Sequence, residues 1–499
     1  MDYHSSIIKI GNISLGGGNP VRIQSMTTTN TMDTAATVSQ VKQLAIAGCD
    51  FVRITTRNIK EAENLKNIKN ELRKEGVEVP LIADVHFNPK VAESVAPNVE
   101  KVRINPGNYI DLQQDTSSKG NEDDYVINAL SESLLPLITV CKQYDTAIRI
   151  GVNHGSLSNR ILVKYGNTAL GMVESIMEFV RVCSIHGFEK LVLSLKSSSV
   201  VTMIEANMLL VDRLSKARFN YAIHLGITEA GNGEEARVKS SAGIGYLLAY
   251  GIGDTIRVSL AEDPLEEIPV AIKLVEFYGL RKDITGSIKT ELNYFHRSRF
   301  SVKPPVVLTS EYSEFSDLSV DKRPVVEQHK SGEEFYSIRK FSYPGLSYED
   351  LMIKATIDVS IVMNKSNPDG IWIDNLKNTS SDQIAQLTFN ILQVLDLRIT
   401  KTEYIACPTC GRSTINVIKQ LDTLKEKTSN IPGLKIAVMG CSVNGPGEMV
   451  GANYGCVGAG KGMVHIYKDG NIAQRNTPEE LAVDSIIKLI EESNDHSNS

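Results

Sequence analysis

Short runs of apolar and β-branched residues recur along the first 280 residues, and amphipathic segments separate them. The separating segments, such as 34–47, 59–75 and 168–186, carry apolar residues at helical spacing. Strands that alternate with helices indicate βαβ units and a parallel sheet. Eight such units in about 250 residues is the size of a (β/α)8 barrel. The predicted strands are 21–27, 51–56, 81–86, 101–107, 147–153, 190–196, 222–228 and 254–260.

The pattern changes after residue 280 and again near residue 400. Residues 281–400 begin polar and irregular, and then hold apolar runs at 357–362 and 371–373 and a helical pattern at 381–395. These features predict an inserted domain or a structured linker. Residues 401–499 are predicted to form a compact α/β domain. Its expected elements are a strand at 403–406, a helix at 413–427, strands at 435–439 and 463–467, and a helix at 478–491.

The overall composition is that of an ordinary soluble protein. Hydrophobic residues make up 42% of the chain, charged residues 22%, and the net charge is −6. This balance gives no sign of a nucleic-acid binder. The N-terminal residues lack the basic and apolar regions of a signal peptide, and no run is long enough to span a bilayer. We therefore expect a cytoplasmic protein with no membrane partner and with reduced thiols.

Five of the eight predicted strands present a cation near their C-terminal end. In a parallel barrel this end holds the active site, and the interior is normally apolar. Five converging positive charges would repel one another unless an anion meets them. Structural ion pairs could account for each cation alone, but less readily for a set at equivalent positions. Because arginine forks match phosphate oxygens, the pattern favours a diphosphate ligand. The cations are Arg53, Arg103, Arg149, Lys196 and Arg257, and Asn153 and Ser259 share strand faces with two of them.

Other polar residues at the strand ends leave their roles open. Asp84 and His86 end one strand, and each could equally be a hydrogen-bonded structural residue. Glu229 follows the strand at 222–228. Its carboxyl group could handle protons or could simply begin a helix, and the sequence does not separate these interpretations.

Three of the seven cysteines gather between residues 407 and 441. Cys407 and Cys410 form a C-x2-C turn, which lets two thiolates face one metal centre, and Cys441 lies in a Gly- and Pro-rich stretch. Spacing alone leaves the fourth ligand open between Cys456 and Glu448. Four cysteines would suit zinc or a cluster, whereas three cysteines with a carboxylate would suit a reactive iron–sulfur cluster.

The remaining cysteine and glycine features predict no further site. Residues 455–461 start like a phosphate-binding loop, but Gly462 stands where a Ser or Thr should hold magnesium. We expect a flexible Gly-rich turn there. Cys49, Cys141 and Cys183 lie in apolar helical contexts and are expected to be packing residues.

Several motifs together resemble the 4-hydroxy-3-methylbut-2-en-1-yl diphosphate synthase family, which acts in the methylerythritol phosphate route to isoprenoids. They span the barrel and the last domain, and together they are highly specific. The matching segments are SMTT at 25–28, ADVHF at 83–87, KVRINPGN at 101–108, IRIGVN at 148–153, LSLK at 193–196, HLGITEAG at 224–231, GIGDTIRVSL at 251–260, CPTCGR at 407–412 and VNGPGE at 443–448.

The resemblance implies an iron–sulfur oxidoreductase. The barrel would bind 2-C-methyl-D-erythritol 2,4-cyclodiphosphate, and the C-terminal domain would carry a [4Fe-4S] cluster reduced by flavodoxin or ferredoxin. Reductive ring opening and dehydration would give 4-hydroxy-3-methylbut-2-enyl diphosphate. Glu448 would yield its place to a substrate oxygen, and Glu229 is the candidate for proton handling. The implied cluster ligands are Cys407, Cys410, Cys441 and Glu448, and the implied substrate contacts are Arg53, Arg103, Arg149, Asn153, Lys196, Arg257 and Ser259.

The insert departs from the short form of the family, in which the barrel leads almost directly to the cluster domain. Short forms pair as homodimers, with the cluster domain of one subunit closing on the barrel of the other. A homodimer is therefore one arrangement to expect, and closure within one chain is the other. Two rival functions also remain: a non-redox iron–sulfur hydro-lyase, and a zinc-stapled barrel that binds a phosphorylated metabolite.

Overall fold

The computed structural model describes residues 3–109, 122–280, 282–288, 291–296, 305–320, 335–366, 368–375, 378–443 and 445–497. Eight parallel strands close into a barrel, as predicted. The strand at 254–260 is regular only at Thr255–Ile256, because beyond it the chain leaves the ladder at the barrel mouth. In chain order the strands are β3 (Arg22–Met26), β4 (Phe51–Thr55), β5 (Leu81–Asp84), β6 (Lys101–Ile104), β7 (Ala147–Asn153), β8 (Leu191–Lys196), β9 (Ala222–Leu225) and β10 (Thr255–Ile256).

Amphipathic helices surround the barrel and bury their apolar faces against it. Local capping fixes where several begin: Asp33, Asn58, Thr168 and Ser199 each accept a hydrogen bond from the backbone of the following helix. The principal helices are α1 (Thr34–Ile46), α2 (Ile59–Lys74), α3 (Pro89–Val95), α5 (Glu122–Tyr144), α7 (Ala169–Ile185), α8 (Val200–Lys216), α9 (Gly233–Ser240) and α11 (Glu267–Tyr278).

A short hairpin closes the N-terminal end of the barrel. Its strands, β1 (Ile8–Ile10) and β2 (Ile13–Leu15), pack on the first residues of the barrel strands, among them Phe51, Ile82 and Ala147. The hairpin therefore covers the barrel at the end opposite its C-terminal mouth.

The middle region forms a five-stranded sheet with two helices on it. The apolar run at 357–362 lies inside α12 (Tyr348–Ser366), and the predicted helix at 381–395 is α13 (Ser381–Val394). Ile357 packs so closely on the barrel segment Ser241–Gly245 that a Cβ on Gly245 would lie 2.2 Å from its side chain. The strand order is β11 (Glu291–His296), β14 (Phe335–Ser342), β15 (Gly370–Asp374), β12 (Val306–Thr309) and β13 (Leu318–Ser319).

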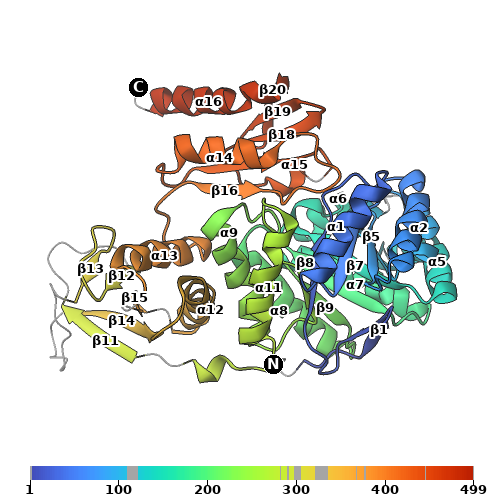
Figure 1. Ribbon diagram of the computed structural model, residues 1–499, viewed down its shortest axis with the longest axis horizontal. Helices are drawn as coiled ribbons and strands as arrows, with labels where there is room; N and C mark the ends of the chain where they lie inside the picture. The colour runs from blue at the N-terminus through green and yellow to red at the C-terminus, as the bar shows by residue number, and fades with distance from the viewer. Residues whose placement is uncertain are drawn as a thin grey trace.

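The C-terminal region is a second five-stranded sheet, which lies over the open end of the barrel (Figure 1). The helix predicted at 413–427 is α14 (Val417–Thr428), capped by Asn416, and the final helix is α16 (Ala482–Ser497). Residues 455–461 are not a flexible turn, because most of them form β18, which pairs with both β17 and β19. The strands are β16 (Glu403–Ala406), β17 (Lys435–Met439), β18 (Tyr454–Gly460), β19 (Met463–Lys468) and β20 (Asn471–Pro478). Within the described residues, no helix is long and apolar enough to cross a membrane.

Candidate active site

Glycines in the barrel make room for the buried cations. Arg103 and Arg149 are direct neighbours in the register of β6 and β7. A Cβ on Gly151 would lie 2.8 Å from Arg103 Nε, and one on Gly226 would lie 2.5 Å from Lys196 Nζ. A side chain at either glycine would therefore displace a cation.

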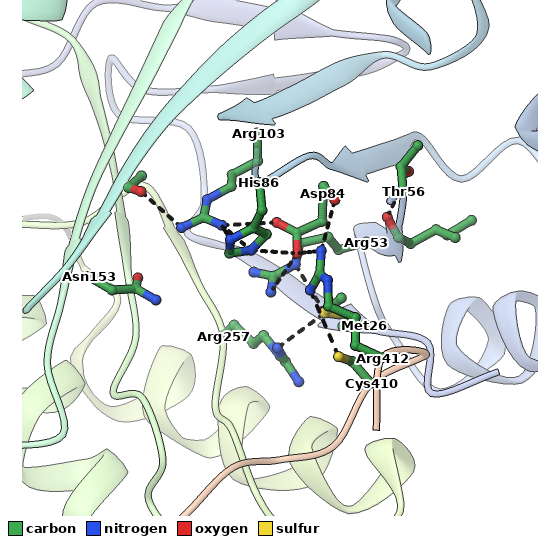
Figure 2. A network of polar contacts seen from close by, with 12 residues as sticks. Met26, Arg53, Thr56, Asp84, His86, Arg103, Asn153, Arg257, Cys410 and Arg412 are labelled. Carbon is green, nitrogen blue, oxygen red and sulfur yellow. Dashed lines mark hydrogen bonds and ion pairs between the residues drawn. The ribbon is translucent and has the colours of Figure 1, made fainter. Parts of the chain in front are cut away.

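Asp84, at the end of β5, is the centre of the polar network drawn in Figure 2. Its carboxylate lies 3.3 Å from Arg103, 3.6 Å from Arg53 and 3.0 Å from Arg412. Burial alone would raise the pKa of Asp84, but the surrounding cations, chiefly Arg53, hold it well below its usual value. Asp84 is therefore a charged residue shared by several guanidinium groups, which sequence analysis left undecided.

His86 belongs to the same network as a neutral imidazole. Its Nε2 atom lies 2.6 Å from the Nη1 atom of Arg103. Burial, together with the positive charges of Arg103 and Arg412, lowers the pKa of His86 to about 3. A neutral ring with an unprotonated Nε2 can accept a hydrogen bond from Arg103, so His86 helps to orient that guanidinium.

The other three strand-end cations differ in their partners. Arg257 forms a two-point pair with Glu267, in which Nη2 lies 2.9 Å and Nε 3.2 Å from the carboxylate oxygens. No carboxylate pairs with Arg149 or Lys196 among the residues that the structure describes. The Nε and Nη1 atoms of Arg149 also have no hydrogen-bond partner there, although this side chain is only 1% exposed. Structural ion pairs thus account for some of the cations but not for Arg149 and Lys196.

The cysteine-containing loops of the C-terminal domain face this barrel mouth. Cys407 follows β16, Cys441 follows β17, and the Gly440 backbone N–H donates to Cys407 Sγ at 3.2 Å. Glu448 ends the short helix α15 (Gly445–Glu448) and is buried. Asn444, in the motif at 443–448, lies outside the described residues.

Cys456 lies elsewhere in the C-terminal domain. It is fully buried on β18 and packs in the apolar core with Val438, Ile466 and Ile486. Among the described residues, no three His, Cys, Asp or Glu side chains are arranged to hold a single metal ion.

The barrel and the C-terminal domain of one chain touch at the site itself. Asn153 Nδ2 donates to Glu448 Oε1 at 2.5 Å. Gly155 and Gly447 meet backbone to backbone, since a Cβ on Gly447 would lie 1.8 Å from the Gly155 carbonyl oxygen. This contact gives a physical reason for glycine at position 447. In this structure, both sides of this contact belong to the same chain.

A second contact between the domains brings two carboxyl groups together. Ala406 donates its backbone N–H to the Glu229 carbonyl at 3.2 Å, and Gly231 donates to the Ala406 carbonyl at 3.3 Å. Glu229 adopts a left-handed backbone conformation, with φ of 50°. Burial, and then the neighbouring Glu448 carboxyl, raise the pKa of Glu229 well above its usual value. Glu229 is thus favoured in its protonated form beside Glu448.

One cavity of about 100 Å³ joins these groups. Arg412 also lines it, and sequence analysis missed this residue even though it ends the 407–412 motif. Glu267, the partner of Arg257, was missed as well, because it belongs to α11 and carries no sequence signal. The predicted site residues that line the cavity are Arg53, Arg103, Arg149, Asn153, Lys196, Glu229, Arg257, Ser259, Cys407, Cys410, Cys441 and Glu448.

Comparison with known proteins identifies relatives over nearly the whole chain. A protein of Bacteroides fragilis named 4-hydroxy-3-methylbut-2-en-1-yl diphosphate synthase (flavodoxin) is 38% identical, with 99% of this chain and 96% of the relative covered. Proteins with the same name from Porphyromonas gingivalis and Leptospira interrogans are 38% and 32% identical, covering 98% and 97% of this chain and 97% and 96% of the relatives. The first alignment spans 600 positions although this chain has 499 residues, so that relative contains segments absent here.

Some solved structures share a weak likeness with this chain. A sialic acid synthetase from Leptospira borgpetersenii is 14% identical with a TM-score of 0.36, and covers 56% of this chain and 90% of its own. Family models give a direct assignment instead. The model described as the GcpE TIM-barrel domain matches residues 5–272, and the model described as the GcpE protein C-terminal domain matches residues 403–492. Together with the full-length relatives, these matches show that the chain belongs to the GcpE family.

Proposed function

We propose that this protein converts 2-C-methyl-D-erythritol 2,4-cyclodiphosphate to 4-hydroxy-3-methylbut-2-enyl diphosphate in isoprenoid biosynthesis. The observation that carries the proposal is the single cavity shared by the barrel cations and the three clustered cysteines. A diphosphate held by the cations would lie directly against the cysteine loops. The names of the relatives, which state a diphosphate synthase, support the same reaction.

A [4Fe-4S] cluster held by Cys407, Cys410, Cys441 and Glu448 fits the residues present. Three thiols and a carboxyl group line the same cavity, and the Gly440 N–H donates to one of the sulfurs. Cys456 packs in an apolar core, which makes Glu448 the better fourth ligand. Such a cluster, when bound, would supply the electrons for the reduction one at a time.

The barrel residues would bind and orient the cyclic diphosphate. Arg149 and Lys196, which lack carboxylate partners in the described chain, have unused charge to offer to phosphate oxygens. The same cations would stabilise the diphosphate as it leaves C2 of the substrate. The remaining proposed contacts are Arg53, Arg103, Asn153, Arg257 and Ser259.

Glu229 would supply a proton to the C3 hydroxyl as it departs as water. Burial and the neighbouring Glu448 raise the pKa of Glu229 and so favour its protonated form, and its Oε2 atom has no hydrogen-bond partner within the described residues. Glu448 would remain beside the reacting atoms, because Asn153 and Glu229 give it partners apart from the cluster. Closure of the two domains would also keep bulk water out of the cavity.

Flavodoxin is the proposed electron donor, because the names of the relatives state it. We divide the chain into three domains: a substrate-binding barrel at 1–280, an insert at 281–400 and a cluster-binding domain at 401–499. One chain supplies both walls of the cavity, so a homodimer is not needed to complete the site.

The deciding experiment measures iron, acid-labile sulfide and the visible spectrum of anaerobically purified protein, followed by turnover of the cyclodiphosphate. Cluster-containing protein that forms the product only when a reductant is supplied would support the proposal. Turnover without reductant would instead indicate a non-redox hydro-lyase. Colourless, zinc-containing protein without sulfide would indicate a metabolite-binding barrel.

A further inference from the structure

Asp84 is the one carboxylate that joins the barrel cations to the C-terminal domain in the network of Figure 2. From the barrel side it holds Arg53 and Arg103, two of the proposed phosphate contacts. From the other side Arg412 donates to it twice, with Nη2 lying 3.0 Å from the carboxylate and 3.1 Å from the Asp84 carbonyl. Asp84 is fully buried, so these contacts are shielded from water.

Arg412 touches the cluster loop as well as the barrel. Its Nη1 atom lies 3.9 Å from Cys410 Sγ, while Nη2 holds Asp84. Hydrogen bonds to sulfur ligands tune a bound cluster, and partners of this kind also orient the ligands. A single buried side chain therefore connects the proposed cluster to the proposed phosphate site.

When the domains are closed, the guanidinium of Arg412 contacts the Asp84 carboxylate, which also pairs with two barrel arginines. Asp84 carries one negative charge, whereas Arg53, Arg103 and Arg412 together carry three positive charges. The excess positive charge repels itself in a buried setting unless an anion enters. A diphosphate bound by Arg53 and Arg103 would supply that negative charge, and would thereby favour the docking of Arg412.

We infer that Asp84 and Arg412 form a latch that couples diphosphate binding in the barrel to closure of the cluster domain. Both are positioning residues for the reaction. The inference rests on the proposed function, and it adds the means by which the two domains respond to substrate. Because coupling is reciprocal, the latch also makes the closed state bind the diphosphate more tightly.

The test uses cluster-containing protein, inorganic pyrophosphate as the probe, and hydrogen exchange at the backbone amides of Gly231 and Ala406. These two amides bond across the domain contact and therefore report closure. In the wild type, pyrophosphate should slow their exchange about tenfold. In Arg412→Gln this slowing should disappear, and the affinity for pyrophosphate should fall about tenfold. Arg412→Lys keeps the charge but has no second nitrogen to reach Cys410 while it contacts Asp84, so it should give intermediate values.

A matched control breaks a different ion pair between the same two domains. Lys239, on α9, lies 3.0 Å from Glu403 on β16, and neither residue belongs to the proposed phosphate site. Lys239→Met should speed exchange in the absence of pyrophosphate but keep the slowing that pyrophosphate causes. Glu403 retains Lys435 as a partner, so the variant should fold.

The outcomes separate the latch from the proposed function. Full pyrophosphate-dependent slowing in Arg412→Gln would overturn the latch, and so would loss of slowing in both Arg412→Gln and Lys239→Met. Loss of slowing in Arg412→Gln alone supports it, whatever the enzyme assay gives. A wild type that closes on pyrophosphate but never converts the cyclodiphosphate would contradict the proposed function and leave the latch standing.

Discussion

Replacing Arg149 by methionine should raise the stability of the protein and lower its affinity for a diphosphate. Arg149 is 1% exposed, and its Nε and Nη1 atoms have no hydrogen-bond partner in the described chain. Burial, and then the nearby Arg53 and Arg103, hold the pKa of Arg149 well below its usual value. The fold therefore bears the cost of an unpaired buried cation, and methionine keeps the apolar stem without that charge.

The expected gain follows from the two unpaired nitrogens. Each buried, unsatisfied polar group costs about 1–3 kcal/mol, so removal of both should raise the free energy of unfolding by about 2–6 kcal/mol. The lost contact should at the same time weaken pyrophosphate binding by about tenfold to hundredfold, because hydrogen bonds to charged groups contribute about 1.5–3 kcal/mol.

Arg257→Met is the matched control, because Arg257 is equally buried but paired. Removing it would leave Glu267 as an uncompensated buried charge, with a loss of about 3–5 kcal/mol in the free energy of unfolding. Urea unfolding gives the stability of each variant, and calorimetric titration with pyrophosphate gives the affinity. A loss of stability in Arg149→Met similar to that in Arg257→Met would refute the argument that Arg149 lacks a partner.

Three further predictions test other parts of the site. Cys441→Ser should lose the cluster absorbance and sulfide, whereas Cys456→Ser should keep both. The reverse result would show that Cys456, and not Cys441, is a cluster ligand. Lys196→Ala should weaken substrate binding, and mixing it with Cys441→Ser should restore no activity, because one chain supplies both residues to its cavity; recovery on mixing would show closure between subunits. Burial alone would raise the pKa of Glu403, but two lysines hold it at about 2. Ionised Glu403 should therefore raise the free energy of unfolding by about 2 kcal/mol relative to Glu403→Gln. Chemical unfolding should show this difference above pH 5 and its loss as the pH falls through about 2. A difference that does not change with pH would contradict this assignment.

Much of the fold could be predicted because it depends on local periodicity. Each barrel strand carries its apolar residues in a short run, and five of the eight predicted runs also carry a cation. The failures have physical causes. Residues 455–461 contain only one β-branched residue, Val457, among several glycines, yet most of them form β18 because two neighbouring strands supply its hydrogen bonds. The strand at 254–260 ends early, because pairing to β3 and β9 extends only over Thr255–Ile256.

The partners of the cations were beyond prediction, because contact across the fold carries no mark in the sequence. Arg257 and Glu267 are only ten residues apart, but their pairing depends on how α11 packs against the barrel. Arg412 and Asp84 are 328 residues apart and meet only when the C-terminal sheet covers the barrel. Sequence analysis could find the cations by their repeated positions, and it could not determine which of them were already neutralised.

The insert gives a structural reason for closure within one chain. It packs on the barrel through α12 and through α13, whose Asn390 donates to Glu234 of the barrel helix α9 at 2.7 Å. Gln393 of α13 donates to the carbonyl of Lys401, just before the C-terminal domain, at 3.3 Å. The chain leaves α13 at Val394 and enters β16 at Glu403, so the cluster domain begins beside the barrel that it covers. Only a short connection separates these elements, and Lys401 within it pairs with Glu235 of α9. The insert thus holds the start of the cluster domain against its own barrel, while the Asp84–Arg412 contact remains free to respond to the ligand.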